Sequence, residues 1–382
     1  MRLLVVVTLA LGLCSEACSG GPFIAAPHTP LPLIAGHDEK VIVHPQLVTI
    51  TFPGYAYTQK VQAFGDFIGN SKWLKTVGTE YGVGAATHVA KVVWPAAAVD
   101  QTTDQGLRTL LGTGITSGTL PAPPTGTSSL VYIVYWPSNV VLDASGQGAG
   151  VLCQHGSFHS AGGLFTAGYH DSFTAPNGTR VDYAVVGDCS ESIDAITTSA
   201  SRELIGTFTN PFEFENSGWL LDVRSADPWF MDASSGEVGY MCERELAVRE
   251  SSWALHRSWS NAAALASTQP CLPSPEGTAY YNVSASPATT VRVGAGTTVV
   301  YTFTGWSSQA VSQWQLAVQR PEGSDFSLAD LAPSFGSSTM QNGGTTTLTL
   351  HVPGSARAAQ LGGLDVMSGP QEHAWPVAFE VQ

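Results

Sequence analysis

The chain has 382 residues, of which 43% are hydrophobic and only 12% are charged, and its formal net charge is −14. This length and apolar content are sufficient for two domains with cores of their own. The acidic balance argues against a nucleic-acid-binding protein, because the sequence has no basic stripe to meet phosphates. After the first residues, no apolar run is long enough to cross a membrane as a helix.

The first 17 residues are organised as a signal peptide. Leu3 to Leu13 form an apolar segment that is too short to span a bilayer. The small residues Ser15 and Ala17 favour cleavage after Ala17, which would leave Cys18 as the first residue, as in a bacterial lipoprotein. The sequence therefore predicts export and leaves two destinations open: a lipid anchor on Cys18 at the outer membrane or cell surface, or free secretion. The anchor is the only membrane contact that we expect.

A flexible tether is predicted for residues 18–40, whose first half is rich in Gly, Pro and Ala. Strands and helices then alternate through residues 41–270, which indicates an α/β or α+β domain. In chain order we expect a strand at 46–52, helices at 57–67 and 71–77, a strand at 89–94, a helix at 100–111 capped by Asp100, a buried strand at 130–136, an irregular segment at 144–168, a strand at 183–186, and a helix from Ile193 that Asn210-Pro211 ends.

The pattern of apolar and polar residues changes after a Pro-rich hinge at residues 271–278. Residues 279–382 contain short alternating strands, such as 297–303 and 345–352, separated by turn residues. About one hundred residues of this pattern predict an immunoglobulin-like β-sandwich.

Four cysteines remain outside the signal peptide. They are Cys153, Cys189, Cys242 and Cys271. In an exported chain they predict two structural disulfides, and three pairings are possible.

The helix that begins at Ile193 has the outline of a zinc-hydrolase helix. Such a helix places a metal-binding His one turn before a second ligand, with a Glu beside the first His as general base. Arg202 and Gly206 occupy the two ligand positions here, and Glu203 occupies the base position. A guanidinium stays protonated and cannot bind a cation, so the metal ligands are missing from this helix.

The chain resembles bacterial secreted proteins related to the plant EXORDIUM, or phosphate-induced protein 1, family. The resemblance covers roughly residues 41–264. The segments that carry it are 80–84, 168–173, 183–189, the helix with 209–212, 217–219, 236–242 and 257–261. It implies a zincin-like domain, since many bacterial members have Ser-His-Glu-Leu-x-Glu and then Thr-Asp-Pro in the helix, and an acidic residue before Leu-Cys downstream.

The chain departs from that bacterial pattern at Arg202, Gly206, Asn210 and Tyr240, whereas Glu203 and Glu237 remain. The plant relatives also lack the His-Glu pair and carry Thr-Asn-Pro-Phe, so the resemblance implies a non-catalytic branch.

We therefore expect a cleft without a metal, in which Arg202 replaces the lost cation and pairs with Glu203, Glu237 or both. Gly206 would leave room on the same helix face. His170 and Asp171 match a family motif and are expected to line the same cleft as Glu203, which would be a remnant of the general base.

Two other functions remain open from the sequence. His155 and His159 have ligand spacing, and with His170 they would form a shifted zinc site in an active metallohydrolase. Alternatively, the β-sandwich would bind carbohydrate or cell wall. The favoured interpretation is an exported, catalytically degenerate protein, without a cofactor, that binds an unknown protein or a cell-wall glycan.

Overall fold

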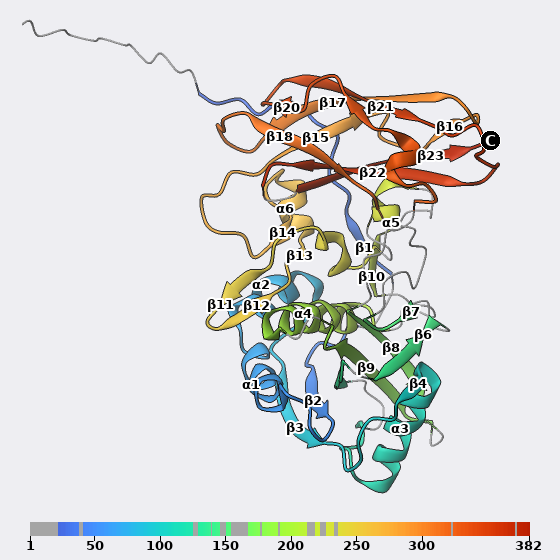
Figure 1. Ribbon diagram of the computed structural model, residues 1–382. Coiled ribbons are helices and arrows are strands. Elements are labelled where there is room, and N and C mark those ends of the chain that lie inside the picture. The colour runs from blue at the N-terminus through green and yellow to red at the C-terminus, as the bar shows by residue number, and fades with distance from the viewer. Residues whose placement is uncertain are drawn as a thin grey trace, which may run out of the picture.

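The computed structural model describes most of the chain after the predicted signal peptide. The described residues are 22–37, 41–124, 129–138, 140–145, 150–153, 167–175, 178–189, 192–211, 218–221, 227–232, 236–321, 324–370 and 373–382. In these parts of the chain no helix has the length and apolar character needed to cross a membrane. The fold is mixed α/β, rich in strands, with a β-rich C-terminal region (Figure 1).

A five-stranded mixed sheet forms the centre of the first region. Its strand order is β3-β2-β5-β9-β8. The strands are β2 (Gln46–Thr51), β3 (Thr87–Val93), β5 (Leu130–Trp136), β8 (Gly168–Thr174) and β9 (Arg180–Gly187). The first four strands in this order are parallel, and β8 lies antiparallel to β9 at the edge. All seven residues of β5 are buried, as expected for a strand covered on both faces.

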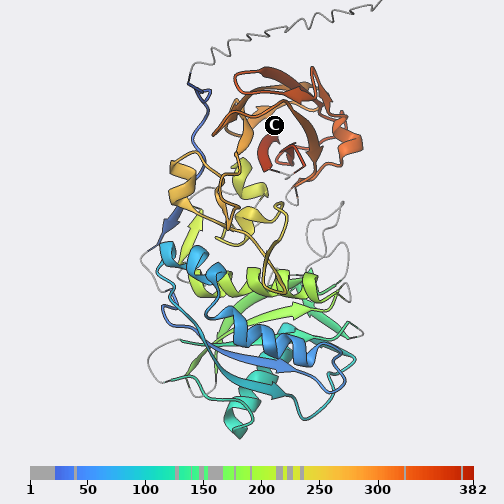
Figure 2. The ribbon, with the colours of Figure 1, turned by 90° about the vertical axis from the view of Figure 1, so that its left-hand side faces the viewer.

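Helices cover both faces of this sheet (Figures 1 and 2). One face packs against α1 (Thr58–Ile68), α2 (Lys72–Gly78) and α4 (Ile193–Thr209). The other packs against α3 (Asp104–Ser117), with a small sheet of β4 (Gln101–Thr103), β6 (Val141–Ala144) and β7 (Gly150–Val151) alongside. Alternate residues of β2, β5 and β9 enter one apolar cluster or the other, because successive side chains of a strand point to opposite faces.

Both predicted bounds of α3 are wrong, because the helix begins at Asp104 and continues to Ser117. The sequence favoured a helix at 100–111 with Asp100 as its cap. In the structure residues 101–103 instead pair with β6 as a strand, and α3 begins at Asp104. The cap is Thr103, whose side chain accepts a hydrogen bond from the backbone N of Gly106 at 3.3 Å.

The C-terminal region consists of two packed sheets with a common apolar interior. One has the order β15-β17-β21-β19 and the other β16-β23-β22-β18-β20. The strands are β15 (Tyr281–Ser286), β16 (Val291–Val293), β17 (Thr298–Ser307), β18 (Trp314–Gln319), β19 (Ser334–Phe335), β20 (Thr339–Met340), β21 (Thr345–His351), β22 (Leu361–Ser368) and β23 (His373–Val381), and the short helix α7 (Leu328–Leu331) lies between β18 and β19.

Small elements connect the two regions. They are β10 (Trp219–Leu221), α5 (Pro228–Asp232), η3 (Tyr240–Cys242), the hairpin of β11 (Val248–Glu250) and β12 (Trp253–Leu255), α6 (Asn261–Leu265), and the pair of β13 (Ser258–Trp259) with β14 (Cys271–Leu272). Residues 271–272, expected at the start of a hinge, are therefore part of a strand pair.

Residues 22–37 form a packed segment, which differs from the flexible tether expected there. The His28 ring stacks on Trp306 at a centroid distance of 3.6 Å, which holds the segment on the C-terminal region. Further on, β1 (Ile34–Gly36) pairs with β10. The Asn261 side chain accepts from the backbone N of Ile34 and donates to its O, at 2.8 and 2.7 Å. We call residues 22–37 the N-terminal strap.

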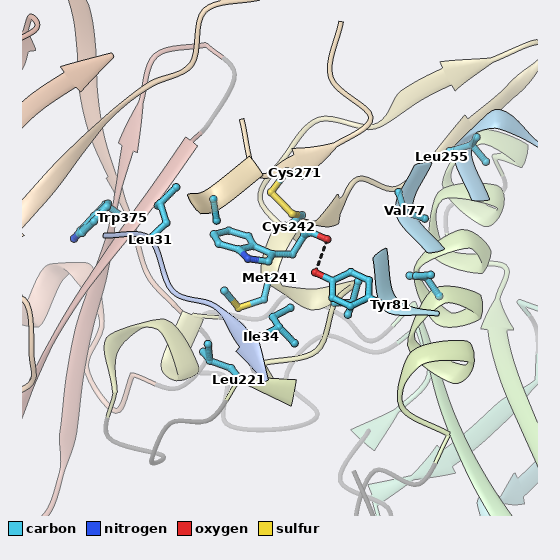
Figure 3. Packing of buried hydrophobic residues seen from close by; sticks show 14 of the residues in the cluster. Leu31, Ile34, Val77, Tyr81, Leu221, Met241, Cys242, Leu255, Cys271 and Trp375 are labelled. Atoms are coloured by element: carbon cyan, nitrogen blue, oxygen red, sulfur yellow. Dashed lines mark hydrogen bonds between the residues drawn. A yellow bond between two sulfur atoms is a disulfide. The ribbon is translucent and has the colours of Figure 1, made fainter. Parts of the chain in front are cut away.

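A single apolar cluster extends through the junction into both regions (Figure 3). Leu31 and Ile34 of the strap, Tyr81 of the first region and Trp375 of β23 all belong to it. The Tyr81 hydroxyl donates to the backbone O of Trp259 at 2.9 Å. The two regions therefore share one core, and burial of apolar area stabilises their contact.

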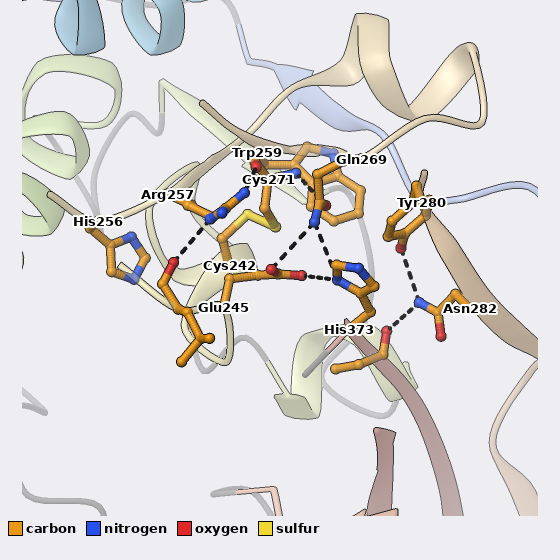
Figure 4. Close-up of a disulfide and its surroundings, with 12 residues drawn as sticks. Cys242, Glu245, His256, Arg257, Trp259, Gln269, Cys271, Tyr280, Asn282 and His373 are labelled. Atoms are coloured by element: carbon orange, nitrogen blue, oxygen red, sulfur yellow. Dashed lines mark hydrogen bonds and ion pairs between the residues drawn. A yellow bond between two sulfur atoms is a disulfide. The ribbon is translucent and has the colours of Figure 1, made fainter. Parts of the chain in front are cut away.

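Polar side chains and a disulfide complete the junction (Figure 4). Nδ1 of His373 lies 2.7 Å from Oε1 of Glu245, and Gln269 contacts both side chains. A cavity of about 20 Å³ beside Glu245 is large enough for one water molecule.

The cysteines form Cys153–Cys189 and Cys242–Cys271. This confirms the expectation of two disulfides and selects one of the three pairings. The bonds indicate that the protein folds in an oxidising, extracellular environment.

Candidate functional site

The candidate site lies where α4 packs against the edge strand β8. The apolar face of α4 packs into the core between the helices and the sheet. It consists of Ile196, Ala200, Leu204 and Phe208. The helix ends at Thr209, and the Asn210 side chain turns back into the site. This packing fixes Arg202, Glu203 and Gly206 on the side of α4 that meets β8 and the segment 236–243.

Glu203 is fully buried, with 0% exposure, and both of its carboxylate oxygens have partners. Oε1 accepts from Nε of Arg202 at 2.9 Å. Oε2 lies 3.2 Å from Nδ1 of His170 and 3.5 Å from the hydroxyl of Tyr240. Burial alone would raise the pKa of Glu203, but Arg202 and then His170 outweigh burial and lower it. Glu203 is therefore an ionised carboxylate held between two cations.

His170 joins the two buried carboxylates of the site. Its Nδ1 faces Glu203, and its Nε2 lies 3.3 Å from Oε1 of Glu237. Burial acts to lower the pKa of His170, but Glu237 and Glu203 raise it well above the usual value. The raised pKa favours the imidazolium form, in which Nδ1 hydrogen-bonds Glu203 and Nε2 lies within ion-pair distance of Glu237 without a hydrogen bond.

Gly206 provides the space for this imidazole. A Cβ atom at position 206 would lie 2.5 Å from Cε1 of His170, closer than real Cβ contacts allow. Any larger side chain at this position, including a metal ligand, would displace the His170 ring. The room expected beside Gly206 is thus occupied by a side chain from the neighbouring strand.

Arg202 pairs with Glu203 and with Glu243, whose Oε1 accepts from Nη1 at 2.7 Å. Its guanidinium carbon also lies 4.8 Å from the centre of the Tyr240 ring, a cation–π contact. The sequence offered Glu203, Glu237 or both as partners, and the structure selects Glu203. Glu243 was missed by the sequence reasoning, because no local pattern connects it to a residue of α4 that lies 41 positions earlier.

Glu237 has different partners from those expected. It pairs with His170, as described, and Oε1 also accepts a hydrogen bond from the Asn210 side-chain amide. Asn210 in turn accepts from the backbone N of Gly218 at 2.7 Å, which orients the amide. Asn210 entered the sequence analysis as the end of the helix and as a departure from the family pattern, and in the structure it also connects the end of α4 to this carboxylate.

Asp171 does not belong to this site, contrary to the expectation from the sequence. It follows His170 in a strand, so its side chain points to the opposite face of the sheet. There its Oδ2 accepts from Nη2 of Arg108 at 2.5 Å, beside Asp104 and Tyr183. His170 and Asp171 therefore take part in two separate ion-pair clusters.

A second buried histidine borders the site. The pKa of His256 is lowered to about 3, first by burial and then by the nearby charge of Arg202. It is therefore neutral at physiological pH, and its backbone N donates to the Ser201 hydroxyl at 2.8 Å. The sequence analysis did not single out His256, because burial beside a cation cannot be read from its local sequence.

The acidic side chains of the site pair with the protein's own cations. The carboxylates of Glu203 and Glu237 approach different nitrogens of one imidazole, so the three groups do not converge on a common point. Within the described ranges, no three His, Cys, Asp or Glu side chains are grouped in a way that could hold a metal. His155 and His159, the other members of the shifted ligand set, lie outside the described residues, as does Cys18.

Comparisons with known proteins do not assign the chain to a family. No protein-family model matches it, and no curated protein matches it.

Proposed function

We propose that the protein is an exported binding protein whose first region is a catalytically degenerate zincin-like domain. One observation carries the proposal: the His170 imidazolium lies between Glu203 and Glu237, in the space that Gly206 leaves beside α4. Together with Arg202 it supplies positive charge where a zinc ion would be held in an active relative. The protein's own cations then keep the carboxylates in place.

The state of Glu203 supports loss of hydrolysis. A general base must reach a water molecule and bind a proton with a pKa near the working pH. Glu203 is fully buried, its oxygens are engaged by Arg202 and His170, and its pKa is lowered. Such a carboxylate is poorly suited to take a proton from water.

The order of the strands supports an immunoglobulin-like fold for the C-terminal region and a zincin-like fold for the first region. In the C-terminal region, β15-β17-β21-β19 and β18-β22-β23 correspond to the ABED and CFG sheets of an immunoglobulin-like sandwich. In the first region, the helix with the base position follows the parallel strand β9 and faces the antiparallel edge strand β8. Export follows from residues 1–17, with a lipid on Cys18 or free secretion as the two destinations.

Elemental analysis and a peptidase assay test the proposal against the shifted ligand set. We expect less than stoichiometric zinc in dialysed protein and no EDTA-sensitive cleavage of casein, for both the natural chain and a His170→Ala variant. His44→Ala, at an exposed histidine, is the matched control. The shifted set of His155, His159 and His170 predicts the opposite: about one zinc per chain, with metal and activity both lost in His170→Ala. That outcome would contradict our proposal.

A further inference from the structure

The outer face of the sheet β15-β17-β21-β19 is a regular array of hydroxyl groups. Alternate residues of β17 and β21 point away from the core, while Val299, Tyr301, Phe303, Leu348 and Leu350 point into it. We call the outward set the hydroxyl face: Thr298, Thr302, Thr304, Thr345, Thr347 and Thr349, with Ser286 and Ser334 on the flanking strands. The sheet lies at the end of the molecule away from α4 (Figure 1).

Strand register places these hydroxyls in rows across the sheet. Thr302 is opposite Thr347 and Thr304 is opposite Thr345. Ser286 extends the first of these rows on β15. Neighbouring strands are about 4.8 Å apart and alternate residues about 6.7 Å apart, so the face is a grid of donors and acceptors. No hydrogen bond joins these threonine hydroxyls to another described residue.

The composition of this face is unusual for an exposed surface. Strand propensity accounts for threonine, but edge strands such as β15 and β19 ordinarily carry charged residues, especially Lys, as well. The four strands contain no Asp, Glu, Lys or Arg, although the chain as a whole has a net charge of −14, and the one imidazole on the face is that of His351, opposite Thr298 at its edge. Val300, 51% exposed, is the large apolar residue on the array. The aromatic Trp306 at its end is covered by His28 of the strap.

We propose that the hydroxyl face docks on the surface of an insoluble, neutral polysaccharide. Polyhydroxylated chains match a grid of hydroxyls that both donate and accept, and the absence of charge selects a neutral polymer over an anionic one. Each hydrogen bond contributes little after exchange with water, so binding needs many contacts at once. A packed polymer surface supplies them, whereas a short soluble sugar does not. This inference is independent of the site on α4.

Co-sedimentation of the full mature chain with polymer particles tests the proposal. We expect binding to microcrystalline cellulose or starch granules, little binding to carboxymethylated cellulose, and no competition by short glucose oligomers. Thr302→Val with Thr347→Val removes two paired hydroxyls, keeps side-chain size and strand propensity, and should weaken binding about tenfold. Thr87→Val, at an exposed strand position of the first region, is the matched control.

Unchanged melting temperatures show that the variants are folded. No binding to either neutral polymer would overturn the proposal, as would full binding by the double variant or a preference for the anionic polymer. Self-association that the double variant abolishes would instead identify a contact between copies and also overturn it. Metal content and peptidase activity do not enter this experiment, so it can fail while the proposed loss of catalysis stands.

Discussion

His170 is the residue on which the candidate site depends. It contacts both buried carboxylates, Glu203 and Glu237, from a strand that the helix motif does not include. Removing one partner from a buried ion pair leaves an uncompensated charge, which costs more stability than the intact pair contributes. The His170 side chain therefore stabilises the folded protein by compensating the two buried carboxylates.

Replacement of His170 by Gln should lower the free energy of unfolding by about 3–5 kcal/mol. The loss should depend on pH, because the folded-state pKa of His170 is raised. The stabilisation is fully present below about pH 6.5, the usual histidine value, and declines as pH rises toward the raised pKa.

Urea denaturation of the natural chain and His170→Gln across this pH range measures the effect. His44→Gln, at an exposed position, is the control. A difference between His170→Gln and the natural chain that grows with pH would contradict a cationic His170.

At the scale of elements, α4 packs closely against β8 because position 206 of the helix is a glycine. Gly206 lets the helix approach the His170 ring, whereas glycine inside a helix ordinarily weakens it. The helix outline, its apolar face and its end at Asn210-Pro211 followed from the sequence, because these depend on local periodicity and on proline geometry. The position of the His170 ring beside Gly206 did not follow from the sequence, because His170 is in a strand 36 residues earlier in the chain.

Gly206→Ala should destabilise the protein by about 1–3 kcal/mol, although such a change usually stabilises a helix. The new methyl group overlaps His170, so the cost should largely disappear in a His170→Ala background. A double-mutant cycle in urea measures this coupling. Gly112→Ala in α3 is the matched control, since its methyl group would make only an ordinary contact with Phe173 at 3.9 Å, and it should stabilise by about 0.5–1 kcal/mol. Equal effects at both glycines would contradict the overlap.

At the scale of the whole molecule, the strap and the shared core join the two regions. Composition favoured a tether before the first domain, because that segment is rich in Gly, Pro and Ala, and a hinge after the domain, because that segment is rich in Pro. In the structure Leu31 is 5% exposed, and the apolar cluster is continuous across the junction. We expect the regions to unfold together instead of as independent modules.

Calorimetry should show one cooperative transition for the full chain. Leu31→Ala should lower its midpoint without splitting it, at a cost of about 2–5 kcal/mol, because a buried leucine is lost from the shared cluster. Leu33→Ala, where the side chain is 43% exposed, should change stability far less. Two separate transitions in the natural chain would contradict a shared core.

The sequence by itself determined the mixed α/β region, the β-rich C-terminal region, the two disulfides and the charge-bearing residues Arg202 and Glu203 of α4. These properties follow from composition and from periodicities of a few residues. Only the tertiary structure decided that His170 lies between Glu203 and Glu237, that Asp171 is on the opposite face of the sheet, that Glu243 is the second partner of Arg202, and that residues 22–37 are packed. Each of these depends on which strand lies beside which helix, and contacts between segments far apart in the chain are not encoded in any local pattern.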